Sequence, residues 1–339
     1  MHRSIELATL GGGYVAPNPM VGAVLVHNGQ IIGEGYHKLY GGPHAEVNCI
    51  ASVSEKSRHL IPDSAIYVSL EPCAHYGKTP PCADLIIREK INKVFVGTRD
   101  PFAEVNGKGI EKLLAAGTEV TAGILENECK DLNRRFFTFH TKHRPYIILK
   151  WAQTADHKIG NAGNNRLMIT NEFTNRIVHK WRSEEAAIMA GTNTVMLDDP
   201  QLTNRLWNGS HPVRVIVDMD LRLPSSLHVF DGTVKTIVFN ALKHEENEHL
   251  VYYQVTRDVN LVHQVLNGLY QMKILSVMIE GGAKLIQSFI DEGLWDEARV
   301  ITNGLLVLNH GVAAPILTDA LIRTEEFSGE DQIKTYIPN

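Results

Sequence analysis

Two kinds of hydrophobic pattern alternate along the first half of the chain. Short apolar and β-branched runs predict strands, whereas apolar residues that recur every three or four positions predict helices. The predicted strands cover residues 21–27, 30–35, 65–70, 92–97 and 118–124. The predicted helices cover residues 4–10, 44–50, 83–90 and 109–116, and the segment 133–139 is helical or extended. Strands that alternate with helices indicate an α/β/α layered sheet.

The same alternation returns in the second half, after a polar and basic stretch. We place a domain boundary near residues 141–145, which divides the chain into residues 1–143 and 144–339. The predicted strands of the second half cover residues 146–150, 186–190, 213–218, 235–239, 276–280 and 297–301. Helices are predicted at residues 171–181, with Thr170 as the N-cap, and at residues 283–292. Both domains are therefore expected to be α/β.

Composition narrows the class of protein. The chain has 339 residues, which is long enough for two domains with separate cores. Its net charge of −5 does not favour a surface for nucleic acid. The first residues lack the apolar segment of a signal peptide, and no apolar run of about 18 residues occurs, so we expect no membrane partner. Four cysteines are few for this length and are typical of a reducing compartment, so we expect a cytoplasmic protein.

The candidate chemistry begins with one histidine and two cysteines. His44 begins a predicted helix, Cys73 follows a predicted strand, and Cys82 opens another predicted helix. An imidazole and two thiolates are three ligands for a tetrahedral zinc ion, which leaves the fourth position for a water molecule. Glu46 lies two residues after the histidine, is not needed as a ligand, and is free to move protons at that water. This arrangement is typical of zinc-dependent nucleobase deaminases.

The spacing of the two cysteines leaves an alternative open. The common deaminase pattern has two residues between its cysteines, whereas eight residues separate Cys73 from Cys82. Two unrelated core cysteines and a surface histidine are the competing interpretation. The metal interpretation is favoured because the three ligand types occur in the right order, with Glu46 two positions after His44 and Pro72 before the first cysteine.

Three motifs of the first half resemble a known enzyme family. They are Pro-Asn-Pro-Met-Val-Gly at residues 17–22, His-Ala-Glu-Val at 44–47, and Glu-Pro-Cys-Ala-His-Tyr-Gly-Lys-Thr-Pro-Pro-Cys at 71–82. They closely resemble the deaminase half of the bifunctional deaminase–reductase family of riboflavin biosynthesis, in which eight residues between the cysteines are usual. The resemblance implies a cytidine-deaminase-like domain in which Asn18 contacts the substrate and His75 and Lys78 flank its phosphoribosyl side. Taken alone, Asn18 also suits a turn, and Lys78 also suits a solvated loop.

The second half resembles the reductase domain of the same family. The matching pieces are residues 144–150, 178–182, 191–195, 198–203 with Arg205, and 280–282. The resemblance implies a dihydrofolate-reductase-like α/β domain that uses NADPH. It implies that the cofactor is lined by Ala152, Thr194, Asp198, Gly282, Ala283 and Lys284. It also implies that the substrate is faced by Arg182, Leu202, Arg205 and Glu280, and it makes Lys150 our candidate for polarising or protonating the sugar carbonyl oxygen.

Several of these residue types also have ordinary structural uses. Arg182 and Arg205 suit a phosphate because a guanidinium binds it through two hydrogen bonds, but either alone is more often an ion-pair partner. Lys150 equally suits the surface end of a strand. Gly281 and Gly282 lie between an apolar strand and a helix, where backbone N–H groups can hold a phosphate. Most such turns only connect elements.

The chain departs from the family at two places. His157 stands where glycine is usual in the turn after the first strand, which costs strain if its φ is positive. Residues 166–170 replace the usual Ser-x-Trp-Ile-Thr. Met168 can still pack on a cofactor face as an adaptable apolar side chain, and Arg166 can add a phosphate or ribose contact.

The resemblance implies a bifunctional enzyme with a small-molecule substrate. A zinc-dependent domain would hydrolytically deaminate a diaminopyrimidinone ribosylamine phosphate, and a second domain would use NADPH to reduce its ribosyl group to ribityl. We expect a homo-oligomer. One alternative is a zinc deaminase that acts on a base within RNA, but an aromatic content of 7% and the acidic balance argue against it. Another is a deaminase with a non-catalytic C-terminal domain, which the departures at His157 and Met168 leave open.

Overall fold

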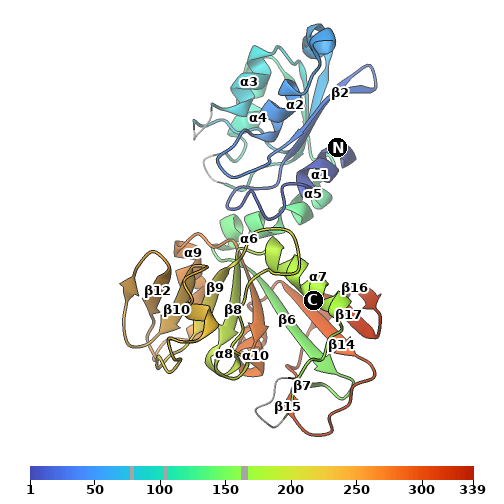
Figure 1. Ribbon diagram of the computed structural model, residues 1–339. Coiled ribbons are helices and arrows are strands. Elements are labelled where there is room, and N and C mark those ends of the chain that lie inside the picture. The colour runs from blue at the N-terminus through green and yellow to red at the C-terminus, as the bar shows by residue number, and fades with distance from the viewer. Residues whose placement is uncertain (77–79, 103–104, 162–166) are drawn as a thin grey trace. The chain divides into compact units, whose positions relative to one another are not determined.

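A five-stranded sheet forms the centre of residues Met1–His143, the first of two units into which the chain divides (Figure 1). The computed structural model describes residues 1–76, 80–102, 105–161 and 167–339. The strand order is β2-β1-β3-β4-β5, with β1 antiparallel to both neighbours and β3, β4 and β5 parallel. The strands are β1 (Gly22–His27), β2 (Gln30–Tyr36), β3 (Ala65–Leu70), β4 (Lys93–Thr98) and β5 (Glu119–Ala122).

Helices cover both faces of this sheet. One face packs against α2 (Ala45–Ala51), α3 (Cys82–Arg88) and α4 (Lys108–Ala115). The other packs against α1 (His2–Thr9) and α5 (Glu126–Leu132). Val96 of β4 lies in the core under α2, α3 and α4, whereas the next residue, Gly97, faces Cys129 of α5, because successive strand residues point to opposite faces. A Cβ on Gly97 would lie 2.4 Å from Cys129 Sγ, so α5 packs this closely only on glycine. The expected α/β/α layering is confirmed.

A ten-stranded sheet forms the centre of residues Arg144–Asn339. Its order is β11-β12-β10-β9-β8-β13-β6-β14-β17-β16. The strands from β12 to β14 in that order run parallel, and antiparallel strands lie at the two edges. The strands are β6 (Tyr146–Thr154), β8 (Ala187–Gly191), β9 (Val213–Val217), β10 (Thr236–Asn240), β11 (Glu245–Glu246), β12 (Leu250–Gln254), β13 (Ser276–Gly281), β14 (Glu297–Asn303), β16 (Ala320–Ser328) and β17 (Asp331–Pro338). A separate pair is formed by β7 (Lys158–Gly160) and β15 (Val312–Ala313).

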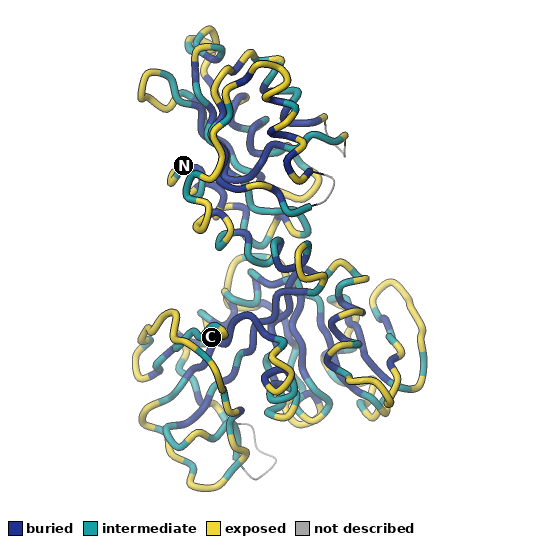
Figure 2. Tube along the Cα trace, turned by 180° about the vertical axis from the view of Figure 1, so that it is seen from behind, coloured by how far each residue is buried: buried dark blue, intermediate teal, exposed yellow. Residues whose placement is uncertain are grey.

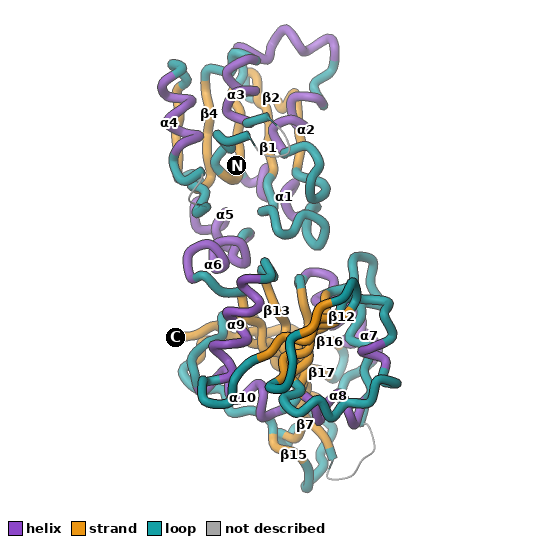
Figure 3. The backbone as a smooth tube through the Cα atoms, turned by 90° about the vertical axis from the view of Figure 1, so that its left-hand side faces the viewer, coloured by secondary structure: helices purple, strands orange, loops and turns teal. Residues whose placement is uncertain are grey.

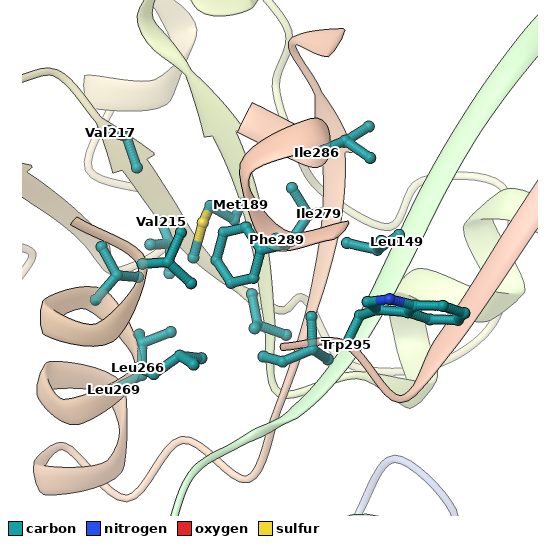
Figure 4. Packing of buried hydrophobic residues seen from close by; sticks show 14 of the residues in the cluster. Leu149, Met189, Val215, Val217, Leu266, Leu269, Ile279, Ile286, Phe289 and Trp295 are labelled. Atoms are coloured by element: carbon teal, nitrogen blue, oxygen red, sulfur yellow. The ribbon is translucent and has the colours of Figure 1, made fainter. Parts of the chain in front are cut away.

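Helices also flank the larger sheet. Figure 3 shows α9 (Leu261–Gln271) and α10 (Ala283–Asp291) on one side and α7 (Glu172–Glu184) and α8 (Thr192–Asp198) on the other. The core under α9 and α10 includes Phe289, Met189 and Leu149 (Figure 4). Because both faces are covered, the central parallel strands are buried on both sides, as Figure 2 shows.

The first unit also contains the 3-10 helix η1 (Glu55–Asp63) and α6 (Arg134–Lys142), and the second contains the short η2 (His228–Phe230). The segment that the sequence left as helical or extended is therefore a helix. None of the helices among the described residues combines the length and the apolarity needed to cross a bilayer.

Several sequence-based element predictions were wrong or incomplete. Thr170 does not cap α7, because Asn171 does: its side-chain oxygen accepts from Thr174 N at 2.9 Å. β6 continues past the predicted end, since it pairs with β14 as far as Thr154. The prediction also omitted several elements, among them α5, α8, α9, β12, β16 and β17. β16 is exposed along most of its length, so it carries no alternating burial pattern that would mark a strand.

Candidate active sites

His44, Cys73 and Cys82 bring their side chains to one point of the first unit. Their possible ligand atoms all lie within 4.8 Å of one another. His44 Nδ1 lies 3.6 Å from Cys73 Sγ and 3.4 Å from Cys82 Sγ. A tetrahedral zinc ion with bonds of about 2.0 Å to nitrogen and about 2.3 Å to sulfur separates such atoms by about 3.5 Å. The donor set and its spacing therefore fit one zinc ion.

Helix starts place two of these three side chains. His44 immediately precedes α2, and Cys82 is the first residue of α3, while Cys73 lies in the loop after β3. Cys82 N donates to Cys73 Sγ at 3.3 Å. Hydrogen bonding to Cys82 and to His44 lowers the pKa of Cys73, against the effect of burial. A lowered thiol pKa favours the thiolate, which is the form that binds metal.

Glu46 lies on the first turn of α2 and is buried beside the same group. Its carboxyl interacts electrostatically with Cys73 and His44 and shares a hydrogen bond with Cys82. Burial, and then the charge of Cys73, raises the pKa of Glu46 to about 7. Glu46 is thus a buried carboxyl beside the three candidate metal ligands, without being one of them, and is placed to exchange protons there.

The side chain of Asn18 is oriented by His37, a residue that sequence reasoning missed. Asn18 Nδ2 donates to His37 Nε2 at 3.1 Å, and His37 Nδ1 donates to the carbonyl oxygen of Pro43 at 3.0 Å. Burial lowers the pKa of His37, which favours the neutral ring that this pattern of one donor and one acceptor requires. Since Pro43 directly precedes His44, this chain of hydrogen bonds ties Asn18 to the candidate metal ligands.

The remaining predicted residues of the deaminase half lie after Cys73. His75 is half-buried, and its ring meets the ring of Phe102 edge-on with centroids 6.2 Å apart. Its Nδ1 is buried and has no hydrogen-bond partner among the described residues. Lys78 lies outside the described residues.

A second cluster of charged side chains lies within the larger unit. Arg182 of α7 donates from Nε and Nη2 to the two oxygens of Glu280 on β13, at 2.7 and 2.6 Å. Arg182 Nη1 donates to the carbonyl oxygen of Thr203 at 3.1 Å. Lys150 of β6 has its Nζ 3.9 Å from Glu280. Three residues that were predicted separately therefore meet in one largely buried network.

The network shifts the pKa values of its members. Burial alone would raise the pKa of Glu280, but the charges of Arg182 and Lys150 lower it to about 2. Burial lowers the pKa of Lys150, and Arg182 adds to this, while Glu280 opposes it. The nearby His179 has its pKa lowered to about 4, first by burial and then by the charges of Arg182 and Arg205. Lys150 is thus a buried amine that releases a proton more readily than an exposed lysine does.

The predicted cofactor residues gather at the carboxyl ends of neighbouring parallel strands. Ala152 lies near the end of β6, Gly282 follows β13, and Thr194 lies in the helix that follows β8. A Cβ on Gly281 would lie 2.6 Å from Thr194 Cγ2, so the turn after β13 packs directly on α8. Gly282 has a φ of +84° and caps the start of α10, where Ala283 and Lys284 follow. Ligands of open parallel sheets commonly bind at this edge.

The other predicted residues of this half differ in how far they are buried. Leu202 is buried in the core with a φ of +49°. Arg205 is exposed, with its backbone N–H donating to His179 Nδ1 at 2.9 Å. Asp198 ends α8 and is exposed, as are Lys284 and Met168. Arg166 lies outside the described residues.

Comparisons with known proteins assign both units. Residues 1–98 match the model of the cytidine and deoxycytidylate deaminase zinc-binding region, and residues 145–319 match the RibD C-terminal domain. The riboflavin biosynthesis protein RibD of Aquifex aeolicus is 42% identical over 306 residues, which cover 88% of this chain and 85% of that protein. The chain belongs to the RibD family.

Other RibD proteins extend the similarity over the whole chain. RibD of Bacillus amyloliquefaciens is 38% identical and covers 97% of this chain and 87% of its own length. A deaminase/reductase of Thermotoga maritima, whose crystal structure is solved, has a TM-score of 0.90 at 38% identity and covers 100% of this chain and 97% of its own. RibD of Acinetobacter baumannii has a TM-score of 0.89 at 31% identity, with the same coverage.

Membership of the RibD family makes the chain a bifunctional enzyme of riboflavin biosynthesis, with a zinc-binding deaminase domain and a reductase domain. The resemblance found in the sequence and the predicted fold class are confirmed. The alternative of a non-catalytic C-terminal domain is not favoured, because that half matches the RibD reductase domain.

Two features of this RibD-family chain escaped sequence reasoning or were left conditional. His37 is an isolated histidine after a strand. Only its position shortly before the His44 motif could have marked it as a candidate site residue. His157 has a φ of +57°, so the strain that its glycine-like turn implied is present. Gln153 Nε2 donates to His157 Nδ1 at 3.0 Å, which gives the histidine a local partner.

Proposed function

We propose that residues 1–143 hydrolytically deaminate a diaminopyrimidinone ribosylamine phosphate and that residues 144–339 then reduce the ribosyl group of the product to ribityl. The observation that carries the first half is the convergence of His44, Cys73 and Cys82 beside the buried carboxyl of Glu46. The Thermotoga maritima relative is described as a deaminase of this pyrimidine class joined to a reductase, which supports the same substrate here.

We assign His44 through Nδ1, Cys73 and Cys82 as the zinc ligands. When bound, zinc supplies a water molecule whose pKa is lowered to about 7. Glu46 would take one proton from that water and pass it to the pyrimidine ring nitrogen, and would then carry a second proton, from the hydroxyl group now on the ring carbon, to the amino group that leaves as ammonia. Its burial keeps the carboxyl among the ligands and away from bulk solvent.

We assign the substrate contacts of this site to the residues around it. Asn18 presents its side-chain oxygen to the pyrimidine, because its Nδ2 is already engaged by His37. His75 faces the phosphoribosyl side, and Lys78 is proposed there from the family resemblance. A hydrogen-bond network that fixes an amide in one orientation improves selection among pyrimidines that differ in one amino group.

We assign the reductase chemistry to the edge of the larger sheet where β6, β8 and β13 end. The nicotinamide cofactor, which we propose is NADPH, supplies the hydride. The cofactor is lined by Ala152, Thr194, Gly282, Ala283 and the exposed Lys284 and Asp198. Met168 packs on one face of the cofactor. Lys150 donates a hydrogen bond or a proton to the sugar oxygen, and Arg182 with Glu280 holds it in place. Arg205, with Arg166, faces the substrate phosphate, and Leu202 contributes through its backbone because its side chain is buried.

A two-stage assay tests both halves. Purified protein should contain one zinc per chain, release ammonia from the diaminopyrimidinone substrate, and only then consume NADPH. Zinc removal by a chelator should stop ammonia release and leave the reduction of separately supplied deaminated substrate intact. Ammonia release that persists without zinc would contradict the first assignment, and NADPH that is never consumed would contradict the second.

We propose that the chain forms a homo-oligomer in a reducing, cytoplasmic compartment. β16 is a terminal strand of the larger sheet, next to β17 alone among the described strands, and it exposes Leu321, Ile322 and Phe327. An antiparallel copy of the same strand would satisfy that edge of the sheet with two-fold symmetry.

The four cysteines are free, which supports the proposed reducing compartment. Light scattering should give a multiple of the chain mass, and Phe327→Lys should reduce it. A monomeric wild-type protein would contradict the proposal.

A further inference from the structure

Glu71 lies two residues before Cys73, and its buried carboxylate accepts hydrogen bonds from backbone N–H groups. It is 4% exposed. One oxygen, Oε2, accepts from Asp100 N at 3.2 Å and Gly107 N at 3.0 Å. The other, Oε1, accepts from Gly109 N at 2.9 Å and Ile110 N at 3.2 Å. No step of the proposed deamination uses this carboxylate. Its role therefore follows from the backbone N–H groups that it binds.

Three of these four donors, Gly107, Gly109 and Ile110, belong to the start of α4, and Asp100 lies in the loop after β4. Gly107 is the N-cap of α4, and the following residues form its first turn. A carboxylate at this position also interacts favourably with the positive end of the helix. The contact is close: a Cβ on Gly109 would lie 1.9 Å from the carbonyl oxygen of Pro72. The backbone that enters Cys73 is therefore fixed against α4.

The backbone that leaves Cys73 is fixed against a different helix. Ala83 N, in the first turn of α3, donates to the carbonyl oxygen of Cys73 at 3.1 Å. Cys73 is thus held between the starts of α3 and α4. Its Sγ lies 3.6 Å from His44 Nδ1, close to the spacing of about 3.5 Å that a shared zinc ion needs. Movement of the Glu71 anchor would change this distance directly.

We propose that Glu71 is a positioning residue for the metal: through α4 it sets where Cys73 presents its thiolate to His44 and Cys82. The inference rests on the proposed assignment of these three residues as zinc ligands. The carboxylate suits the task because both of its oxygens only accept hydrogen bonds, which matches the backbone donors around it. A glutamine side chain of the same shape would turn an NH₂ group toward N–H groups and lose the bonds on that side.

Metal affinity and the spectrum of a cobalt-loaded protein test the proposal without any activity assay. Zinc affinity of Glu71→Gln, measured by competition with a coloured chelator, should fall by about 10- to 100-fold. The thiolate-to-cobalt and ligand-field absorption bands should also shift in position or intensity, because the Cys73 sulfur is displaced. Ile66→Val is the matched control: it loosens the core of the same sheet at a buried position away from the ligands. It should leave both measurements unchanged.

Gly109→Ala provides a second variant in which Glu71 is intact. The added Cβ would push against Pro72, so it should reproduce the loss of affinity and the spectral change. It also decides the matter if Glu71→Gln does not fold. Wild-type affinity and spectrum in the folded variants would show that Glu71 does not position the metal. A wild-type protein that binds no zinc at all would instead overturn the proposed function, and this inference with it.

Discussion

Arg182 and Glu280 form a two-point ion pair in the interior of the larger unit, with both carboxylate oxygens bound at 2.7 and 2.6 Å. Lys150 Nζ lies 3.9 Å from the same carboxylate. One anion therefore compensates two largely buried cations that come from different elements, α7 and β6. The arrangement makes Glu280 the residue on which the charge balance of the proposed reductase site depends.

Removing this anion should destabilise the larger unit. Glu280→Gln leaves Arg182 and Lys150 buried without their counter-charge, which costs about 3 to 5 kcal/mol of unfolding free energy. Urea unfolding followed by tryptophan fluorescence measures this unit specifically, because all four tryptophans lie after residue 144. Glu246→Gln, which breaks an exposed ion pair with Lys235, should change the free energy by less than about 0.5 kcal/mol. Equal stability of Glu280→Gln and wild type would contradict the account.

The same carboxylate predicts an acid dependence of stability. The pKa of Glu280 is about 2 in the folded protein, below its ordinary value of 4.5, so its contribution is fully present above the ordinary value. That contribution is lost as pH falls from about 4.5 toward about 2. Unfolding free energies measured across this range should therefore decline more steeply for wild type than for Glu280→Gln. Parallel curves would show that the ion pair does not lower the pKa of Glu280.

The turn at His157 should prefer glycine to alanine. Its φ of +57° is left-handed, where an L side chain costs about 1 to 2 kcal/mol. His157→Gly should therefore be more stable than His157→Ala by about 1 kcal/mol in the tryptophan-monitored unfolding assay. Neither variant keeps the bond to Gln153, so their comparison isolates the backbone term. Lys158, a strand residue, is the control: there the alanine variant should be more stable than the glycine variant. If glycine were the more stable at both positions, the backbone strain at His157 would be refuted.

Glu46→Gln should separate metal binding from proton transfer. The variant keeps the shape of the side chain and all three proposed ligands, so its zinc content should equal that of wild type. Ammonia release should fall by at least about 100-fold, which is the low end of what a general acid–base contributes. Reduction of supplied deaminated substrate should be unaffected. Normal ammonia release would show that another group carries the proton.

Loss of His37 should weaken substrate binding more than turnover. His37→Ala frees Asn18 Nδ2 and removes the bond to Pro43, so the amide of Asn18 is no longer held in one orientation. We expect KM of the deamination to rise by about 10-fold while kcat falls less. Asn18→Ala should have the same profile, and the double variant should add little, because the two residues act as one unit. Full additivity would show that they act independently.

The sequence alone predicted the class of fold, most central strands and the deaminase class of the first unit. Hydrophobic periodicity is a local property, so β3, β13 and the helix after Gly282 were predictable within a few residues. The order of His44, Glu46, Cys73 and Cys82 predicted a metal site, because the type of each ligand and its position relative to a helix are also local properties of the sequence.

Only the tertiary structure decided which distant residues share a site. The pairing of Asn18 with His37, and of Arg182 with Glu280 and Lys150, depends on how strands and helices pack, which no spacing along the chain encodes. The strain at His157 needed a φ value, and the anchoring of Glu71 on α4 needed the position of a helix more than thirty residues away. Such contacts are set by burial of the whole core rather than by local preference, so they become visible only once the chain has folded.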